Sequence, residues 1–403
     1  MSVWGLRLVV LLEIGLLIGA FPSLGYAQID ELPRPDTAHA GSFGVSVALG
    51  DSIAVVGASG EERCGPNAGA VYIYEREVGP QFDEWNGVAR LTPRTCRANA
   101  FFGEQVALSG HRLLVSASSG ELFAETGSNA AYMFTRTSTG TWTQTARFTG
   151  PPNRSDGSFA ADIDLDDDRA VVSTSGNPDS GGHGAVYVYN YDAATEKWTQ
   201  SARLTAPSDE TPGVLGRGVS LHGNRVAVAA STYFDDSPGT VYVFRRNPEA
   251  QTWAPSAHLT DIDAFFIELE LYGSVLLVGE DRAGPEESGQ ATIFTHRRNQ
   301  GWRKTETLRP SLPYDSGAFG TAVALERSWA LVTGYGEQLN KDFNIDRVVY
   351  VFRRRGGQNW RQRSILDIGQ VDFGAALDLH NATALVSSVP PEGPGSVYIV
   401  QLH

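Results

Sequence analysis

The sequence predicts an all-β fold made of seven copies of one unit with four short antiparallel strands, and three observations predict it. An apolar residue opens each copy, and the copies follow one another at intervals of about 50 to 59 residues. A leucine lies six residues after each opening residue. Six of the eight tryptophans occupy one place in the unit, which chance does not arrange. The opening residues are Phe43, Phe102, Phe159, Leu215, Phe265, Phe319 and Phe373, and the tryptophans are Trp85, Trp142, Trp198, Trp253, Trp302 and Trp360.

The stretch from Ser42 to Thr92 defines the unit. It opens with the alternating run SFGVSVALGDSIAVVGAS, which the pair Gly50-Asp51 divides into two strands. The run GAVYIY then predicts a third strand, and a polar hairpin leads to Trp85 and a fourth strand that ends in GVARLT. Alternating apolar runs bounded by Gly, Asp, Pro and Ser are typical of short strands. Six of the tryptophans open a fourth strand, where we expect them to wedge between neighbouring sheets; a sugar-stacking array is the alternative.

The last copy ends at its third strand, Val397 to Leu402, with no tryptophan strand after it. The missing strand is present at the other end of the chain, because Leu32 precedes Phe43 by eleven residues just as Leu91 precedes Phe102. Residues 28–33 therefore read as a displaced fourth strand that completes the last sheet. Closure of this kind removes the bare stacking face of an open array. The sequence thus predicts a seven-bladed β-propeller.

Composition agrees with many turns and a soluble surface. The chain has 403 residues, 44 glycines and a formal net charge of -14, which argues against a nucleic-acid surface. Residues 1–27 resemble a signal peptide with cleavage after Ala27, so we expect residues 28–403 to be exported as one monomeric propeller, extracellular or periplasmic. Nothing after them is long enough and apolar enough for a spanning helix.

The only cysteines are Cys64 and Cys96, both in the first copy. An isolated pair in an exported chain usually forms a disulfide, and in a propeller both would reach the same face of the first blade. Two buried free thiols are the alternative.

The repeat resembles the FG-GAP repeat. The residues that carry the resemblance are Phe43-Gly44, Phe102-Gly103, Phe319-Gly320 and Phe373-Gly374, with Val56-Gly57-Ala58 after the second strand. This repeat builds the seven-bladed propeller of integrin α-subunit heads, and the present version is closest to its calcium-free type. The calcium loop of the family is missing. Its nearest counterpart, residues 163–168, lacks the glycine that bends such a loop and is expected to be a solvated turn, so no metal or cofactor is predicted. Kelch repeats are the rival interpretation and also give a propeller.

The resemblance implies a ligand-binding surface on the face that carries the second-to-third-strand loops and the blade-to-blade connections. The loops expected there are acidic, although solubility explains any single pair as well. The candidate ligand-face residues are Glu61, Glu62, Asp179, His183, Asp235, Asp236, Asp281, Glu286 and Glu287.

The opposite face is predicted to carry a basic sector at the third-to-fourth-strand hairpins. It could meet acidic glycans, lipid headgroups or an acidic protein, and solvated hairpin ends are the alternative. The candidate polyanion patch is Arg297, Arg298, Arg353, Arg354 and Arg355.

The sequence contains no nucleophile elbow, HExxH, Walker loop or dinucleotide fingerprint. We therefore expect a binding or adhesion-type propeller whose partner is an extracellular protein or a glycan. The alternatives are a secreted glycan lyase or hydrolase that uses carboxylates at one propeller mouth, and a repeat lectin. Asn153 and Asn381 each begin a glycosylation sequon.

Overall fold

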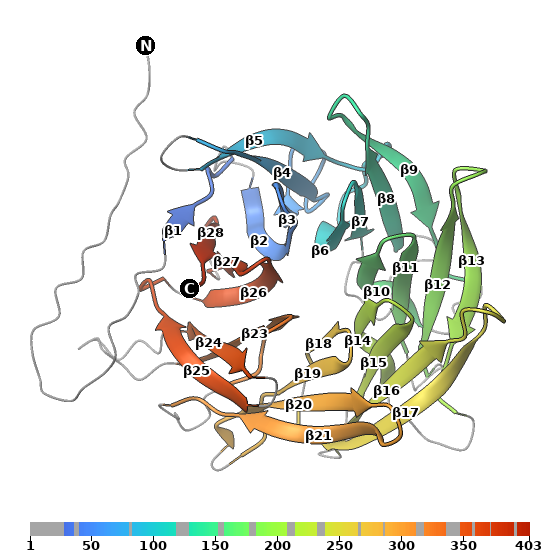
Figure 1. Cartoon of the computed structure of the whole chain (residues 1–403). Coiled ribbons are helices and arrows are strands. Elements are labelled where there is room, and N and C mark those ends of the chain that lie inside the picture. Colours follow the sequence, from blue (N-terminus) through green and yellow to red (C-terminus); the bar gives the residue numbers. More distant parts are fainter. Residues whose placement is uncertain are drawn as a thin grey trace, which may run out of the picture.

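The computed structural model describes most of the chain after residue 27. The described ranges are 28–35, 40–79, 83–117, 129–151, 157–176, 183–207, 214–231, 238–264, 267–284, 287–311, 318–335, 347–356, 359–370, 372–390 and 393–403. Within these ranges the regular structure is β-strand, and the strands form seven four-stranded antiparallel sheets. The sheets follow one another around a central axis as the blades of a propeller (Figure 1). The predicted signal peptide lies outside the described residues.

Each blade runs from an inner strand near the axis to an outer strand at the rim. Blades 1 to 3 consist of β2 (Ala40–Leu49), β3 (Ile53–Glu61), β4 (Ala70–Glu77) and β5 (Glu84–Leu91); β6 (Phe102–Ser109), β7 (Arg112–Ala117), β8 (Ala130–Arg136) and β9 (Trp142–Phe148); β10 (Ser158–Asp166), β11 (Arg169–Ser175), β12 (Ala185–Asp192) and β13 (Lys197–Leu204). Blades 4 and 5 consist of β14 (Val214–His222), β15 (Arg225–Ser231), β16 (Gly239–Arg246) and β17 (Trp253–Ile262); β18 (Leu269–Tyr272), β19 (Val275–Glu280), β20 (Gln290–Arg297) and β21 (Gly301–Leu308). Blades 6 and 7 consist of β22 (Val323–Glu326), β23 (Trp329–Tyr335), β24 (Arg347–Arg355) and β25 (Asn359–Leu366); β26 (Phe373–His380), β27 (Thr383–Ser388), β28 (Ser396–Gln401) and β1 (Ile29–Glu31).

The N-terminal strand β1 closes the ring, as predicted. It pairs antiparallel with β28, with Ile29 opposite Val400 and Glu31 opposite Tyr398 (Figure 1). The Leu32 amide continues the ladder by donating to the Val397 carbonyl at 2.8 Å, and the Leu32 side chain is 2% exposed. The regular strand is only three residues long because Pro33, which has no amide hydrogen, ends the ladder.

The Phe-Gly pair of each repeat explains how neighbouring blades approach. Phe102 is fully buried and meets the Tyr132 ring edge-on, with 5.6 Å between centroids. Gly103 has φ +92°, and a Cβ there would lie 2.7 Å from the Ala70 carbonyl oxygen of blade 1. On the other side of the contact, a Cβ on Gly57 would lie 2.1 Å from the Gly103 oxygen. Only glycine permits this close contact of two backbones.

The hydrophobic core is divided into seven clusters, and each fills the space between two neighbouring blades. The six repeat tryptophans pack in these clusters, each against the preceding blade. This packing agrees with the predicted wedge. In the fifth copy the expected opening residue Phe265 lies outside the described residues, and the first described strand there, β18, begins at Leu269.

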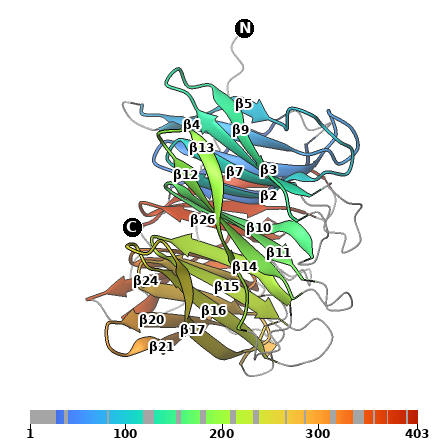
Figure 2. The ribbon, with the colours of Figure 1, turned by 90° about the vertical axis from the view of Figure 1, so that its right-hand side faces the viewer.

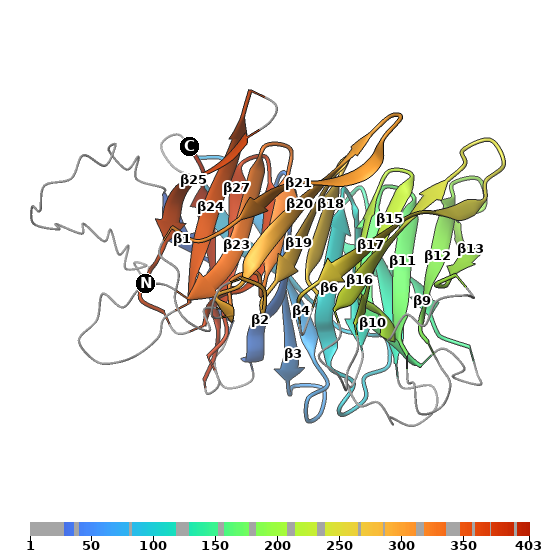
Figure 3. The ribbon, with the colours of Figure 1, turned by 90° about the horizontal axis from the view of Figure 1, so that it is seen from below.

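The disc has two distinct faces (Figures 2 and 3). The hairpin face carries the first-to-second and third-to-fourth-strand turns, and the ends of β20–β21 and β24–β25 project on this side in Figure 3. The loop face carries the second-to-third-strand loops and the blade-to-blade connections. In the described part of the chain, no helix is long and apolar enough to cross a membrane.

Candidate functional site

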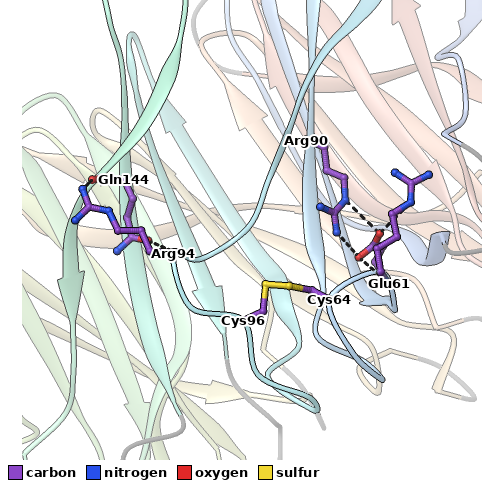
Figure 4. The surroundings of a disulfide bond; sticks show 7 residues. Glu61, Cys64, Arg90, Arg94, Cys96 and Gln144 are labelled. Atoms are coloured by element: carbon purple, nitrogen blue, oxygen red, sulfur yellow. Dashed lines mark hydrogen bonds and ion pairs between the residues drawn. A yellow bond between two sulfur atoms is a disulfide. The ribbon is translucent and has the colours of Figure 1, made fainter.

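The loop face of blade 1 is held by a disulfide. Cys64 lies in the β3–β4 loop and Cys96 in the β5–β6 connection, and their Cα atoms are 5.9 Å apart (Figure 4). The predicted disulfide is therefore present. The β5–β6 connection is also docked on blade 2, because Arg94 donates from its amide and its guanidinium to Gln144 at 3.0 and 2.8 Å. Two independent contacts thus fix this connection on the loop face.

Glu61 belongs to this fastening and is not an exposed ligand-face carboxylate. Its side chain is fully buried and accepts two hydrogen bonds from the Arg90 guanidinium, at 3.2 and 2.6 Å (Figure 4). The Arg63 amide donates to the same carboxylate at 3.3 Å. Glu62, the next residue, is exposed. The alternation of a strand end places Glu61 inward and Glu62 outward, and sequence reasoning did not separate the two.

The other candidate loop-face residues fall into two groups. His183 and Glu287 are exposed, and Asp281 is half-buried. Asp179, Asp235, Asp236 and Glu286 lie outside the described residues. Near the disulfide the described surface carries exposed Arg63, Arg94 and Arg97 beside Glu62, so this part of the loop face is mixed in charge.

The five arginines of the candidate polyanion patch lie on the hairpin face, two at the end of β20 in blade 5 and three at the end of β24 in blade 6. Arg297, Arg298 and Arg355 are exposed, whereas the Arg353 and Arg354 guanidinium carbons lie 4.5 and 5.6 Å from the centroids of the Trp329 and Trp360 rings. Among the described residues none of the five forms an ion pair. Within the described part of the chain, the patch therefore places several positive charges on the hairpin face of an acidic protein.

The inner strands place a set of carboxylates along the propeller axis that sequence reasoning missed. Asp162, Asp164 and Asp166 alternate along β10 and accept hydrogen bonds from backbone amides of β14 and of the turn after it, in the next blade. Their donors are Val219 (2.7 Å), Leu221 (2.6 Å) and Gly223 (2.5 Å). Asp378 of β26 does the same for Leu49 of β2 at 2.6 Å. Carboxylates thus bridge neighbouring inner strands whose backbones do not pair.

Three of these carboxylates, those of Asp162, Asp164 and Asp378, have raised pKa values. Burial raises the pKa of Asp164 and of Asp378 to about 6 each. The hydrogen bonds that these carboxylates accept from backbone amides oppose the shift, because they lower the pKa. Burial also raises the pKa of Glu270 on β18, and the charges of Asp164 and Asp378 add to the shift. The pKa of Glu268 is raised to about 7, first by burial and then by Asp281. Because the Glu268 side chain is exposed to solvent, water screens its charge, and Asp164 and Asp378 are the firmer cases of a raised pKa.

The sequence signal for these carboxylates is the alternation in Asp162-Ile163-Asp164-Leu165-Asp166. This pattern indicates a strand that ends in a solvated turn, but it contains no sign of the contacts with the next blade. Among the described residues, no group of three or more His, Cys, Asp or Glu side chains is arranged to hold a metal ion.

Comparison with known families gives the repeat its name. The FG-GAP repeat family matches residues 26–74, 85–134 and 198–244. The chain carries FG-GAP repeats in these three places, and it folds as a seven-bladed propeller. Two of the matched FG-GAP segments begin at a tryptophan of a fourth strand, Trp85 and Trp198. The segment 26–74 begins with the residues that supply β1, so this strand holds the same place in the repeat.

Solved propellers of diverse kinds resemble the FG-GAP ring at low identity. Sqt1 of Saccharomyces cerevisiae is 9% identical with a TM-score of 0.49, over 88% of this chain and 82% of that chain. A hypothetical selenium-binding protein of Sulfolobus tokodaii is 10% identical with a TM-score of 0.48, over 79% and 76%. A candidate 6-phosphogluconolactonase of Bacteroides uniformis is 13% identical with a TM-score of 0.49, over 81% and 85%. No curated protein matches the chain.

Proposed function

We propose that this FG-GAP propeller is an exported binding protein of the adhesion type, which recognises an extracellular protein or glycan through its loop face. The observation that carries the proposal is the double fastening of the blade 1 loops by the Cys64–Cys96 disulfide and the buried Glu61–Arg90 pair. A disulfide also fits an oxidising compartment outside the cytosol.

Fastening matters for binding because a loop that is already ordered loses less conformational entropy when it meets a ligand. Loops on a rigid scaffold are the usual place for recognition residues. The fastened segment presents Glu62 and Arg63 to solvent beside Arg94 and Arg97 of the adjoining connection. Such a mixed, pre-ordered surface suits a polar partner, and the resemblance to integrin α-subunit propellers supports a ligand on this face.

The test is a binding screen of the purified chain against extracellular proteins and glycans. We expect the double change Glu62→Lys and Glu287→Lys to weaken the ligand found by at least about tenfold. Glu249→Lys is the matched control, because Glu249 is equally exposed but lies on the hairpin face of blade 4. Equal loss in both variants, or no loss in the first, would contradict the proposal. A ligand lost only when Arg353, Arg354 and Arg355 become Ser would assign binding to the polyanion patch instead.

A carbohydrate-active enzyme is the second candidate, and the axial carboxylates favour it. Glu268 lies just before β18 and Glu270 lies within it. Burial raises the pKa of Glu270, and a raised pKa is what a general acid needs near neutral pH. Turnover of a polysaccharide panel that disappears in Glu268→Gln and Glu270→Gln would support this candidate. No turnover by the unaltered chain would eliminate it.

A further inference from the structure

A cleft of about 200 Å³ opens on the hairpin face at the seam between blade 7 and blade 1. Its wall is formed by the β2–β3 turn, the β26–β27 turn and the starts and ends of the adjoining strands. The residues that matter are Asp51, Arg76, Trp85, His380, Asn381 and Gln401. The cleft is on the face opposite the proposed ligand face, so it represents a separate site.

The cleft exists because one repeat position differs at the seam. In three other blades the first residue of the second strand lies near the tryptophan of the next blade. Ile53 of β3 packs in one cluster with Trp142, and Val275 of β19 packs in one cluster with Trp360. Arg112 of β7 lies over the aromatic side chains of blade 3, with its guanidinium carbon 4.2 Å from the Tyr191 ring centroid and 5.9 Å from that of Trp198.

At the seam the corresponding residue is Thr383, the first residue of β27. Its side chain is too short to cover Trp85, and its hydroxyl donates to Gln401 Oε1 at 3.1 Å. The partly exposed Trp85 indole therefore lines the cleft. The cleft at the blade 2–blade 3 boundary is lined by Arg112 itself. At the seam Thr383 thus holds the position from which Arg112 lies over the Tyr191 and Trp198 rings of blade 3.

Polar groups converge on the rim of this aromatic surface. Asp51 Oδ1 accepts from Asn381 Nδ2 at 2.7 Å and is 2.9 Å from His380 Nε2. The Arg76 side chain is held by Asp83, with Arg76 Nε donating to Asp83 Oδ2 at 2.7 Å. Arg76 and His380 in the cleft wall therefore each face a carboxylate. The polar groups around the aromatic surface are carboxylate, amide, imidazole and guanidinium groups.

We propose that this seam cleft binds one neutral sugar ring, a pyranose unit of a glycan. The apolar face of a pyranose stacks on an indole, and its hydroxyls pair with carboxylate and amide groups around the edge. The volume is below the roughly 300 to 1,000 Å³ of pockets for larger small molecules, so it suits one ring and not an oligosaccharide.

The test uses the full chain from a bacterial host, in which Asn381 carries no glycan although it begins a sequon. Free glucose, galactose, mannose, fucose and N-acetylglucosamine are titrated by ligand-observed NMR and by calorimetry. We expect one or more of them to bind at one site with a Kd on the order of 1 mM. Thr383→Arg, which introduces the residue that covers Trp198 in blade 3, is expected to raise that Kd at least about tenfold.

Two variants make the result decisive. Thr383→Ser keeps a short hydroxyl side chain and should bind as the unaltered chain does, which separates occlusion from a general effect of substitution. Asp51→Asn should weaken sugar binding with little change in thermal stability, because the Asp51 side chain is 83% exposed and its contacts are at the surface. No binding by any sugar, or binding unchanged in Thr383→Arg, would overturn the proposal. Loss only in the Glu62→Lys and Glu287→Lys variant would place the sugar on the loop face and also overturn it.

Discussion

The two joints on either side of blade 1 use the same repeat contacts but are fastened differently. At the joint with blade 2, the disulfide ties the connecting segment to blade 1, and Arg136 donates to Glu75 across the joint at 2.5 Å. At the joint with blade 7, the ring closes through the three-residue strand β1, the buried Leu32 and the Asp378–Leu49 hydrogen bond.

The joint with blade 2 thus includes a covalent cross-link, whereas the joint with blade 7 is held by non-covalent contacts. The disulfide cross-links two residues of one continuous stretch of chain and closes a loop there. The seam joins the two ends of the described chain, and packing of Leu32 and the Tyr74 hydroxyl, which donates to the Pro33 carbonyl at 2.7 Å, completes it. We therefore expect separate effects when each joint is weakened.

Replacing both cysteines by serine should have the largest effect. The bond spans a sequence separation of 32 residues, so the chain-entropy model gives a loss of about 3–4 kcal/mol in the free energy of unfolding. Urea unfolding of the double variant and of the oxidised chain measures this difference. Adding a reductant should lower the stability of the unaltered chain and leave the double variant unchanged. Equal stability of the two oxidised proteins would show that the blade 1–blade 2 joint does not depend on the bond.

Leu32→Ala should have the next largest effect and should act at the seam. Leu32 is 2% exposed and packs with Phe43 and Ile399 across the closure, so its truncation is expected to cost about 3 kcal/mol. Ile29→Ala is the matched control, because Ile29 lies in the adjoining strand β1 but is 36% exposed, so its truncation should cost much less. Hydrogen exchange should rise first in β28 and β1. A uniform rise in all seven blades would mean that the seam is not the weakest joint.

The ring and its closure were predictable because both depend on positions that recur. Phe102-Gly103 and its counterparts set the copy number, and the interval from Leu32 to Phe43 equals that from Leu91 to Phe102. Contacts between blades were less predictable, because they join residues about 57 positions apart that no local pattern relates. Asp164 looked like one more polar residue of an alternating strand until its contact with Leu221 placed it between blades. The Trp85 cleft was equally hidden, since it involves a short residue, Thr383, at a position that Ile53, Arg112 and Val275 occupy in three other blades.

Asp378→Asn should have the smallest effect of the three variants. It should change the pH dependence of the free energy of unfolding more than the free energy at any one pH. The pKa of Asp378 is about 6 in the folded chain against 3.8 unfolded, so between about pH 4 and 6 the folded state holds more protons than the unfolded state. The stability due to this group is therefore present at low pH and is lost as pH rises through about 6. The introduced asparagine keeps an oxygen to accept from the Leu49 amide but does not titrate.

We accordingly expect the unaltered chain to lose about 1 kcal/mol relative to the Asp378→Asn variant between about pH 4.5 and 7, a discounted figure because Asp378 is only half-buried. Urea titrations of both proteins at each pH measure the difference. Asp367→Asn, at an exposed site after β25, is the control and should leave the slope unchanged. A difference of opposite sign would mean that the amide of Leu49 stabilises the ionised carboxylate more than burial disfavours it, and the seam would then be held most firmly at neutral pH.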